Sequence, residues 1–268
     1  MLDALLINAA VDLAMMVLLC LVAVRIGDVS FIDAVWGAGM AVLALASFVQ
    51  LGNPGMRAGL LLAMTAIWGL RLGVHLFLRW RGHGEDPRYA RMLGKAREQG
   101  RYGSAAFKVV FGPQSVLLFI TSLPAQVGIL ASGAPALLTP LAWAGFALWL
   151  TGMVFETVGD AQLKAFRADP AMKGKVLDTG LWRYTRHPNY FGDACAWWGI
   201  WLVAATGGQW PMNWVALGSL IGPVFLTFTL TKWSGKPLLE RGLAKTRPGY
   251  AEYVARTSGF IPWPPKQG

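Results

Sequence analysis

Long apolar stretches separated by short polar segments constrain this chain more than any other feature of its sequence. A helix needs about 20 consecutive, mostly apolar residues to cross a membrane. Stretches of about this length recur along the whole chain and use most of its 268 residues. The pattern predicts an all-α, polytopic membrane protein with about seven transmembrane helices, at about 2–24, 31–51, 58–78, 108–131, 136–160, 190–206 and 213–231.

The composition agrees with a membrane protein. Charged residues make up 14% of the chain, whereas soluble domains carry roughly 25%. The 55% of hydrophobic residues exclude a disordered chain, which lacks apolar side chains. Both cysteines, Cys20 and Cys195, lie in apolar stretches, so we expect no disulfide framework. We therefore expect one integral-membrane domain over residues 1–268.

The positive charges are distributed unevenly between alternate connections. Of the 24 Lys and Arg, 22 lie in 79–108, 164–188, 232–268 or at Arg25. Because Lys and Arg concentrate on the cytoplasmic side of membrane proteins, seven spans predict an N-terminus outside and a C-terminus in the cytoplasm. The net charge of +10 is then mainly a topology signal. It indicates anionic lipid as a partner, and we expect neither nucleic acid nor an obligate protein partner.

Ionisable residues inside the apolar stretches each cost about 3 kcal/mol on insertion scales, so each needs a partner or a function. Asp33 opens the second stretch, and Arg71 and His75 lie one turn apart in the third. Arg71 is either a structural ion-pair partner of Asp33 or Glu156 or a ligand-binding group. His75 is either a packed histidine or a catalytic group. Asp12 has no partner that the sequence suggests.

The end of the fifth stretch carries four charged residues on one helical face: Glu156, Asp160, Lys164 and Arg167. They are either simple i,i+4 pairs that stabilise a helix end or one wall of a ligand site.

Further cations and tyrosines gather at the expected cytoplasmic ends of the last three spans. Arg and Lys bind phosphates, aromatic rings stack, and carboxylates accept hydrogen bonds from ribose hydroxyls. This composition is typical of a pocket for a multiply phosphorylated ligand with rings. The sequence has no Gly-x-Gly-x-x-Gly after a strand and no Walker loop, so helix ends and loops would hold a nucleotide. No His-x₃-His or Cys-x₂-Cys occurs, and no metal site is predicted.

Two motifs in the C-terminal half resemble a known family. Residues 180–193, GLWRYTRHPNYFGD, resemble the signature of the steroid 5α-reductase C-terminal-domain family, and residues 250–262, YAEYVARTSGFIP, resemble its end motif. The likeness extends over about residues 140–265, and the chain looks like a bacterial homologue. Isoprenylcysteine and related membrane methyltransferases carry a similar Arg-His-Pro-x-Tyr and a similar tail. The motifs therefore define a superfamily rather than one reaction.

The resemblance implies NADPH-dependent reduction of a carbon-carbon double bond conjugated to a ketone in a steroid-like lipid. It implies a bacterial inner-membrane enzyme whose cofactor enters from the cytoplasm and whose substrate enters from the bilayer. Residues 1–131 would supply the substrate side, and residues 132–268 the cofactor side. An S-adenosylmethionine-dependent methyltransferase of a lipid or isoprenoid acceptor is the alternative, and a sterol-binding protein without cofactor is a third. Dense cations favour NADPH, because S-adenosylmethionine carries no phosphate.

Site residues follow from the motifs and the cation cluster. By resemblance, Asn189 lies beside the nicotinamide, Asp193 stands where the family usually has Glu, and Glu156 replaces the Asn of the family's Asn-x₃-Asp pair. The expected cofactor-binding residues are Glu156, Asp160, Lys164, Arg167, Arg183, Tyr184, Arg186, His187, Asn189, Tyr190, Asp193, Lys232, Lys236, Glu240, Tyr253 and Arg256.

Reduction of an enone places negative charge on its carbonyl oxygen, and a hydrogen-bond donor aimed at that oxygen lowers the barrier. Asp33 is the first candidate, because it falls closest to the family's substrate-side acid. His75 is the second candidate, and Tyr89 is a further one.

Overall fold

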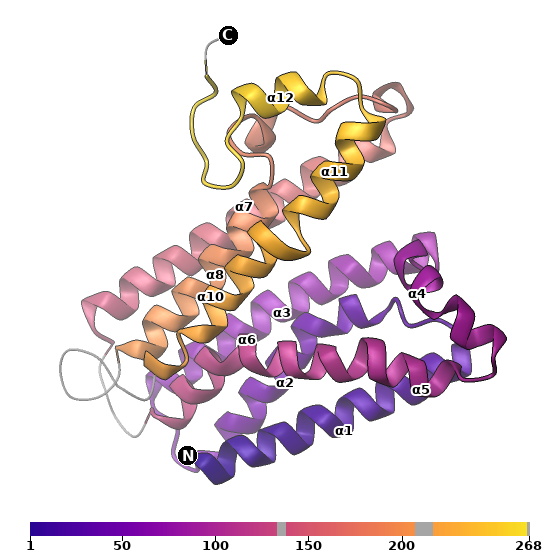
Figure 1. Cartoon of the computed structure of the whole chain (residues 1–268). Coiled ribbons are helices and arrows are strands. Elements are labelled where there is room, and N and C mark those ends of the chain that lie inside the picture. The colour runs from indigo at the N-terminus through magenta and orange to yellow at the C-terminus, as the bar shows by residue number, and fades with distance from the viewer. Residues whose placement is uncertain (133–137, 207–216, 267–268) are drawn as a thin grey trace. The chain divides into compact units, whose positions relative to one another are not determined.

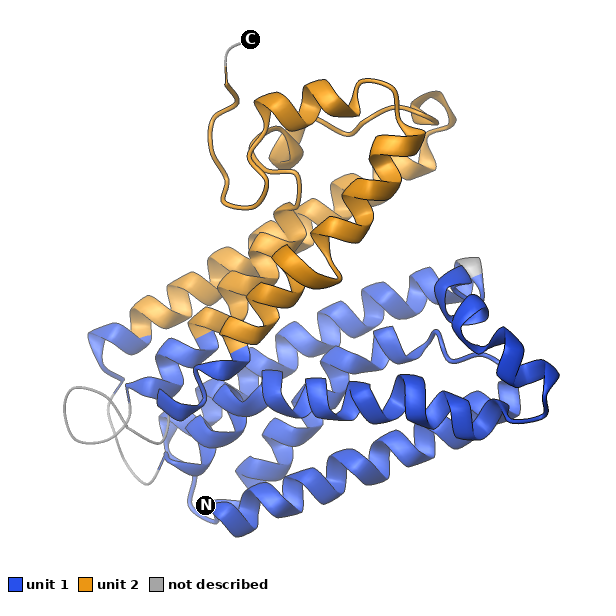
Figure 2. Ribbon diagram, viewed as in Figure 1, with its two compact units in different colours: residues 1–142, 200–222 blue, residues 143–199, 223–268 orange. Residues whose placement is uncertain are grey.

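The computed structural model describes residues 1–132, 138–206 and 217–266, and their regular elements are helices (Figure 1). The chain divides into two compact units (Figure 2). Unit 1 comprises Met1–Ala142 and Ile200–Gly222, and unit 2 comprises Trp143–Gly199 and Pro223–Gly268. The fold class predicted from the sequence, an all-α membrane protein, is confirmed.

Unit 1 is built around four long helices: α1 (Leu2–Ile26), α2 (Ile32–Gln50), α3 (Met56–His83) and α6 (Gly112–Leu130). The shorter helices α4 (Pro87–Glu98) and α5 (Tyr102–Ala106) and a π-helical turn (Phe107–Phe111) connect α3 to α6. Large apolar side chains fill the interior, and others stay exposed on the outer faces, as in Leu6, Leu13 and Leu18 of α1. Helices that are apolar on both faces suit a lipid environment.

Within the part of the chain that the structure describes, five helical segments are long and apolar enough to cross a membrane: Leu2–Ile26, Ile32–Gln50, Met56–Gly82, Tyr102–Leu130 and Pro140–Ala168. They correspond to the first five predicted spans, and they fit an integral membrane protein. The sixth predicted span forms α8 (Pro188–Ala205). The seventh includes 213–216, which lie outside the described residues, and continues in α10 (Ile221–Phe228) and a π-helical turn (Thr229–Trp233). The count of seven and the orientation stay predictions.

Polar residues inside the spans of unit 1 bind one another. The Asn8 amide nitrogen donates to Ser47 Oγ at 2.7 Å and to Gln126 Oε1 at 2.8 Å, which joins α1, α2 and α6. Asp12, for which the sequence suggested no partner, accepts a hydrogen bond from Ser115 Oγ at 2.6 Å. Such bonds between membrane helices each contribute about 1 kcal/mol, so these residues have a structural role.

Unit 2 packs α7 (Pro140–Ala168) against α8 through glycines. A Cβ atom added to Gly192 would lie 2.5 Å from the backbone nitrogen of Glu156, and one added to Gly152 would lie 2.4 Å from the carbonyl oxygen of Gly192. Only glycine permits this approach, which is how small residues pack membrane helices. The remaining helices are α11 (Lys236–Thr246) and α12 (Tyr250–Arg256), and a C-terminal tail follows them.

The first prediction tests the contact between α7 and α8. Gly192→Ala forces the two backbones apart and should lower the stability of the solubilised protein by about 1–3 kcal/mol, the usual cost of overpacking. The measurement is the thermal midpoint in detergent. Gly242→Ala is the matched control, because no atom lies within 4 Å of its added Cβ and alanine is the better helix former. Equal midpoints for the two variants would contradict the close packing.

Candidate functional site

In unit 2, the segment before α8 and the C-terminal tail are joined by many hydrogen bonds. Tyr253 Oη donates to the carbonyl oxygen of Trp182 at 2.6 Å, and Thr185 Oγ1 donates to that of Phe260 at 2.8 Å. Thr185 and Ser258 form a parallel β-bridge. The two motifs that carried the family resemblance therefore form one structural module, which we call the motif–tail module (residues 178–187 and 250–266).

Arg186 is the central residue of this module. Its Nε donates to Glu240 Oε1 at 2.8 Å, and its Nη1 donates to the carbonyl oxygens of Thr257 at 2.6 Å and Val254 at 3.2 Å. The side chains of Arg186 and Glu240 are only 9% and 19% exposed. A largely buried guanidinium with these three acceptors is firmly held.

His187 completes the same cluster. Its Nε2 lies 3.0 Å from Glu240 Oε1, and its ring stacks on Tyr190 with centroids 5.2 Å apart. Burial lowers the pKa of His187, so the neutral imidazole donates to Glu240. Although burial opposes ionisation, hydrogen bonds from His187 and Arg186 hold the pKa of Glu240 at about 2.

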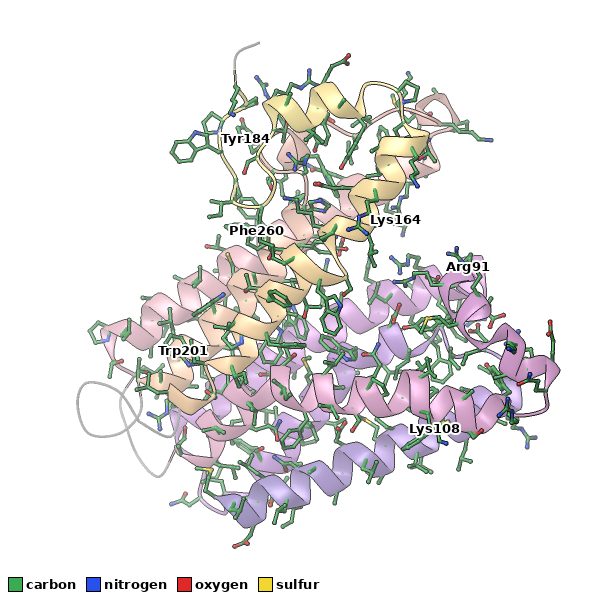
Figure 3. The ribbon with its side chains drawn as sticks, viewed as in Figure 1. Arg91, Lys108, Lys164, Tyr184, Trp201 and Phe260 are labelled. Atoms are coloured by element: carbon green, nitrogen blue, oxygen red, sulfur yellow. The ribbon has the colours of Figure 1, made fainter. Side chains whose placement is uncertain are left out.

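The expected cofactor-binding residues thus fall into three groups. Arg186, His187, Glu240 and Tyr253 use their polar groups to hold the motif–tail module together. The residues of the second group have exposed side chains: Lys164, Arg167, Arg183, Tyr184, Lys232 and Arg256. Figure 3 labels Lys164 and Tyr184 among them. The second group has the accessibility that a bound anion requires. Their roles toward a cofactor stay predictions.

A third group lines the contact between α7 and α8. Asn189 Nδ2 donates to Asp160 Oδ1 at 3.2 Å, and Glu156 is buried where α7 passes Gly192. The rigid His187-Pro188 step starts α8 beside Gly159, and Asp193 follows one turn later. Lys236 lies at the start of α11, and its ammonium group lies beside Gly259 of the tail, where a larger residue would collide with it. The sequence placed Asp160 and Asn189 in one site, and the structure joins them by this hydrogen bond.

The described part of unit 2 also has a pocket of about 410 Å³. Arg183 and Arg256 lie in its wall beside the hydroxyl-bearing Thr179 and Thr257, and Asp178, Gly180 and Pro265 complete the lining. Asp178 forms an ion pair with Arg256. Both arginines were predicted from the sequence, but Asp178 was not, because nothing in its local pattern shows that the tail docks beside it.

In unit 1, Asp33 lies in a cluster at the start of α2. Tyr89 Oη donates to Asp33 Oδ1 at 2.8 Å, and Arg88 Nη2 donates to Asp33 Oδ2 at 3.2 Å. Arg88 also binds Asp86 at 2.9 Å. Arg71 was one of the partners considered for Asp33, and the structure shows that Arg88 binds this carboxylate. The residues Asp86-Pro87-Arg88-Tyr89 start α4, with Asp86 as the N-cap that accepts from the Arg88 amide.

The other donors considered for unit 1 lie on α2 and α3. Trp36 is one turn after Asp33, and its buried Nε1 has no hydrogen-bond acceptor among the described residues. A buried N–H without an acceptor is uncommon, and it is a donor available to a ligand oxygen. His75 is half-buried on α3. Tyr89 is 8% exposed, and burial, followed by the Asp33 charge, raises its pKa. Its hydroxyl therefore keeps its proton at neutral pH.

The chain is an all-helical protein whose long helices suit a membrane. Unit 2 has a pocket lined by two arginines, and unit 1 has a hydrogen-bonded carboxylate–phenol pair. Residues 19–257 match the model of a family described as "Protein of unknown function (DUF1295)". The chain belongs to this family.

The curated relatives align with only part of this chain. It is 33% identical to the probable O-methyltransferase ustE of Ustilaginoidea virens over 38% of this chain and 34% of the relative. It is 37% identical to 3-oxo-5-alpha-steroid 4-dehydrogenase 1 of Mus musculus and of Rattus norvegicus, in each case over 32% of this chain and 29% of the relative. The aligned part spans only about a third of these relatives. No solved structure matches the chain. The similarity to steroid 5α-reductases is confirmed, and it supports an enzyme of the oxidoreductase or methyltransferase kind.

Proposed function

We propose that this protein is an NADPH-dependent membrane oxidoreductase that reduces a carbon-carbon double bond conjugated to a ketone in a steroid-like lipid. The observation that carries the proposal is the pair formed by Tyr89 and Asp33, whose oxygens lie 2.8 Å apart. A protonated phenol held by a carboxylate is the donor that an enone oxygen needs. The steroid dehydrogenase relatives support the same reaction class.

The side chains of unit 2 fit the cofactor. A dinucleotide with three phosphates needs exposed cations, and Arg183 and Arg256 lie in one pocket. Ribose and carboxamide groups need neutral donors and acceptors, which the Asn189–Asp160 pair supplies on α7 and α8. We assign nucleotide binding to these residues and to the exposed Lys164, Arg167 and Lys232.

The chemistry divides between the cofactor and the chain. A bound nicotinamide supplies the hydride, as it does in other enzymes. The carbonyl oxygen of the substrate would then gain negative charge. The Tyr89 hydroxyl has one proton, which it donates to Asp33 Oδ1 in the structure, and it would turn this proton to the substrate oxygen. Asp33 orients Tyr89 before the substrate arrives, and Arg88 holds Asp33 in place. Removing one such donor typically costs about 3 kcal/mol of transition-state stabilisation.

A methyltransferase is the second candidate, since the O-methyltransferase relative aligns over the largest share of this chain among the relatives named above. S-adenosylmethionine carries a sulfonium and no phosphate. A pocket lined by two arginines is a poor match for that charge, and this favours the nucleotide.

The test uses the full chain in detergent or nanodiscs. We expect NADPH oxidation that depends on a Δ4-3-ketosteroid, together with tighter binding of NADPH than of NADH. Parallel reactions contain labelled S-adenosylmethionine and an isoprenoid or lipid acceptor. Methyl transfer without NADPH oxidation would replace the proposal by the second candidate, and binding of neither cofactor would refute both.

A further inference from the structure

We propose that the pocket between Arg183 and Arg256 binds the 2′-phosphate of NADPH and so sets the preference for NADPH over NADH. This inference rests on the proposed function and assigns one part of its cofactor. The pocket recognises a phosphomonoester dianion, a chemistry that a phospholipid headgroup shares. The experiment below separates these two sources.

The lining of the pocket matches a phosphomonoester. Arg183 and Arg256 contribute guanidinium groups, which bind phosphate oxygens in pairs of parallel hydrogen bonds. Thr179 and Thr257 add hydroxyl groups on the same lining, and each hydroxyl can donate one further bond. The volume of about 410 Å³ exceeds what one phosphate fills, so an attached ribose has room as well.

The two arginines stand on walls that the rest of the motif–tail module fixes. Arg183 follows Trp182, whose carbonyl oxygen receives the hydrogen bond from Tyr253. Arg256 precedes Thr257, whose carbonyl oxygen accepts from Arg186 at 2.6 Å. The Lys266 amide donates to the Arg256 carbonyl at 3.0 Å, which places Pro265 in the lining. The cations are therefore preorganised, and less conformational entropy is lost on binding.

Asp178 affects how strongly the pocket binds each of the two nucleotides. A free carboxylate at this point would accept from the ribose 2′-hydroxyl of NADH, as acidic residues do in NAD-binding folds, whereas an arginine accommodates the 2′-phosphate. Here the carboxylate of Asp178 forms an ion pair with Arg256. A phosphomonoester competes with Asp178 for the same guanidinium. Asp178 thus opposes the phosphate, and removing its charge should strengthen binding.

The experiment measures binding of adenosine 2′,5′-bisphosphate and of 5′-AMP to the solubilised full chain by calorimetry. Arg183→Gln and Arg256→Gln should each weaken the bisphosphate about tenfold, because a charge-assisted bond is worth about 1.5–3 kcal/mol and this pocket is open to water. Neither variant should change 5′-AMP binding. Asp178→Asn should bind the bisphosphate more tightly, a gain that damage to the fold would not produce.

Arg241→Gln is the matched control, since Arg241 is exposed on α11 and outside the pocket lining. It should bind both probes as the parent does. Equal losses for NADPH and NADH in the two pocket variants, or no loss for either, would overturn the inference and leave the proposed function intact. Binding to phosphatidate vesicles that the same variants abolish, without any binding of nicotinamide nucleotides, would assign the pocket to lipid and refute both proposals.

Discussion

Arg186→Ala is expected to release the C-terminal tail from the segment that precedes α8. The substitution leaves Glu240 ionised without its guanidinium partner and removes the donors to the carbonyl oxygens of Thr257 and Val254. Breaking a buried ion pair by removing one partner costs about 3–5 kcal/mol. The population of molecules with an open tail should then rise by about a hundredfold or more, and trypsin should cleave within 236–266 correspondingly faster.

A second variant and a change of pH separate this ion pair from a general loss of packing. Glu240→Gln keeps the shape but removes the charge, and it should open the tail less than Arg186→Ala does. Because the pKa of Glu240 is held at about 2, below its ordinary value of 4.5, its stabilising contribution is complete above about pH 4.5. That contribution disappears as the pH falls from 4.5 toward 2, and Glu240→Gln should lack this part of the acid dependence in thermal midpoints.

Arg91→Ala, an exposed change on α4 outside the cleaved segment, serves as the control and should leave the cleavage rate unchanged. A parental cleavage rate in Arg186→Ala would show that the motif–tail module does not depend on this ion pair.

Much of the fold follows from the sequence, because one physical signal carries it. Apolar runs of membrane length predicted the five helices that could span a bilayer, and most of their ends agree within a few residues. The exceptions are the start of the fourth span, which α5 extends to Tyr102, and the end of the fifth, which α7 extends to Ala168. Spacing along one helix also placed Glu156 and Asp160 on one face, where both are buried. Such signals are local, and helix geometry alone converts them into structure.

Contacts between distant segments could not be predicted in this way. Arg186 looked like a phosphate ligand because a cationic side chain in a basic motif has the same local pattern whether it binds an anion or a backbone carbonyl. Only the docked tail reveals that its acceptors are Glu240, Val254 and Thr257. For the same reason the sequence did not reveal that Arg88, which lies 55 residues from Asp33 in the chain, binds this carboxylate. Long-range pairs are chosen by tertiary packing.

The second large effect is expected at Tyr89. If its hydroxyl donates to the substrate oxygen, Tyr89→Phe should lower kcat for enone reduction by about a hundredfold or more, the usual result of removing one such donor. NADPH binding should be unchanged, because the cofactor residues that we propose lie in unit 2. Tyr102→Phe is the matched control: it removes a phenol from the same unit and keeps the ring that Arg97 contacts at 4.7 Å from its centroid.

Variants of Asp33 decide which member of the pair acts on the substrate. Asp33→Asn keeps an acceptor for the Tyr89 hydroxyl and should retain part of the activity, whereas Asp33→Leu removes the acceptor and leaves Arg88 with Asp86 alone. If Asp33 only positions Tyr89, Asp33→Leu should reduce kcat less than Tyr89→Phe does, and the double variant should be no slower than Tyr89→Phe. If Asp33 is itself the donor, Asp33→Leu is the slower variant and Tyr89→Phe keeps substantial activity. Parental rates in both single variants would exclude the pair from catalysis. The donor would then be sought at His75 on α3 or at the buried indole N–H of Trp36, one turn from Asp33 on α2.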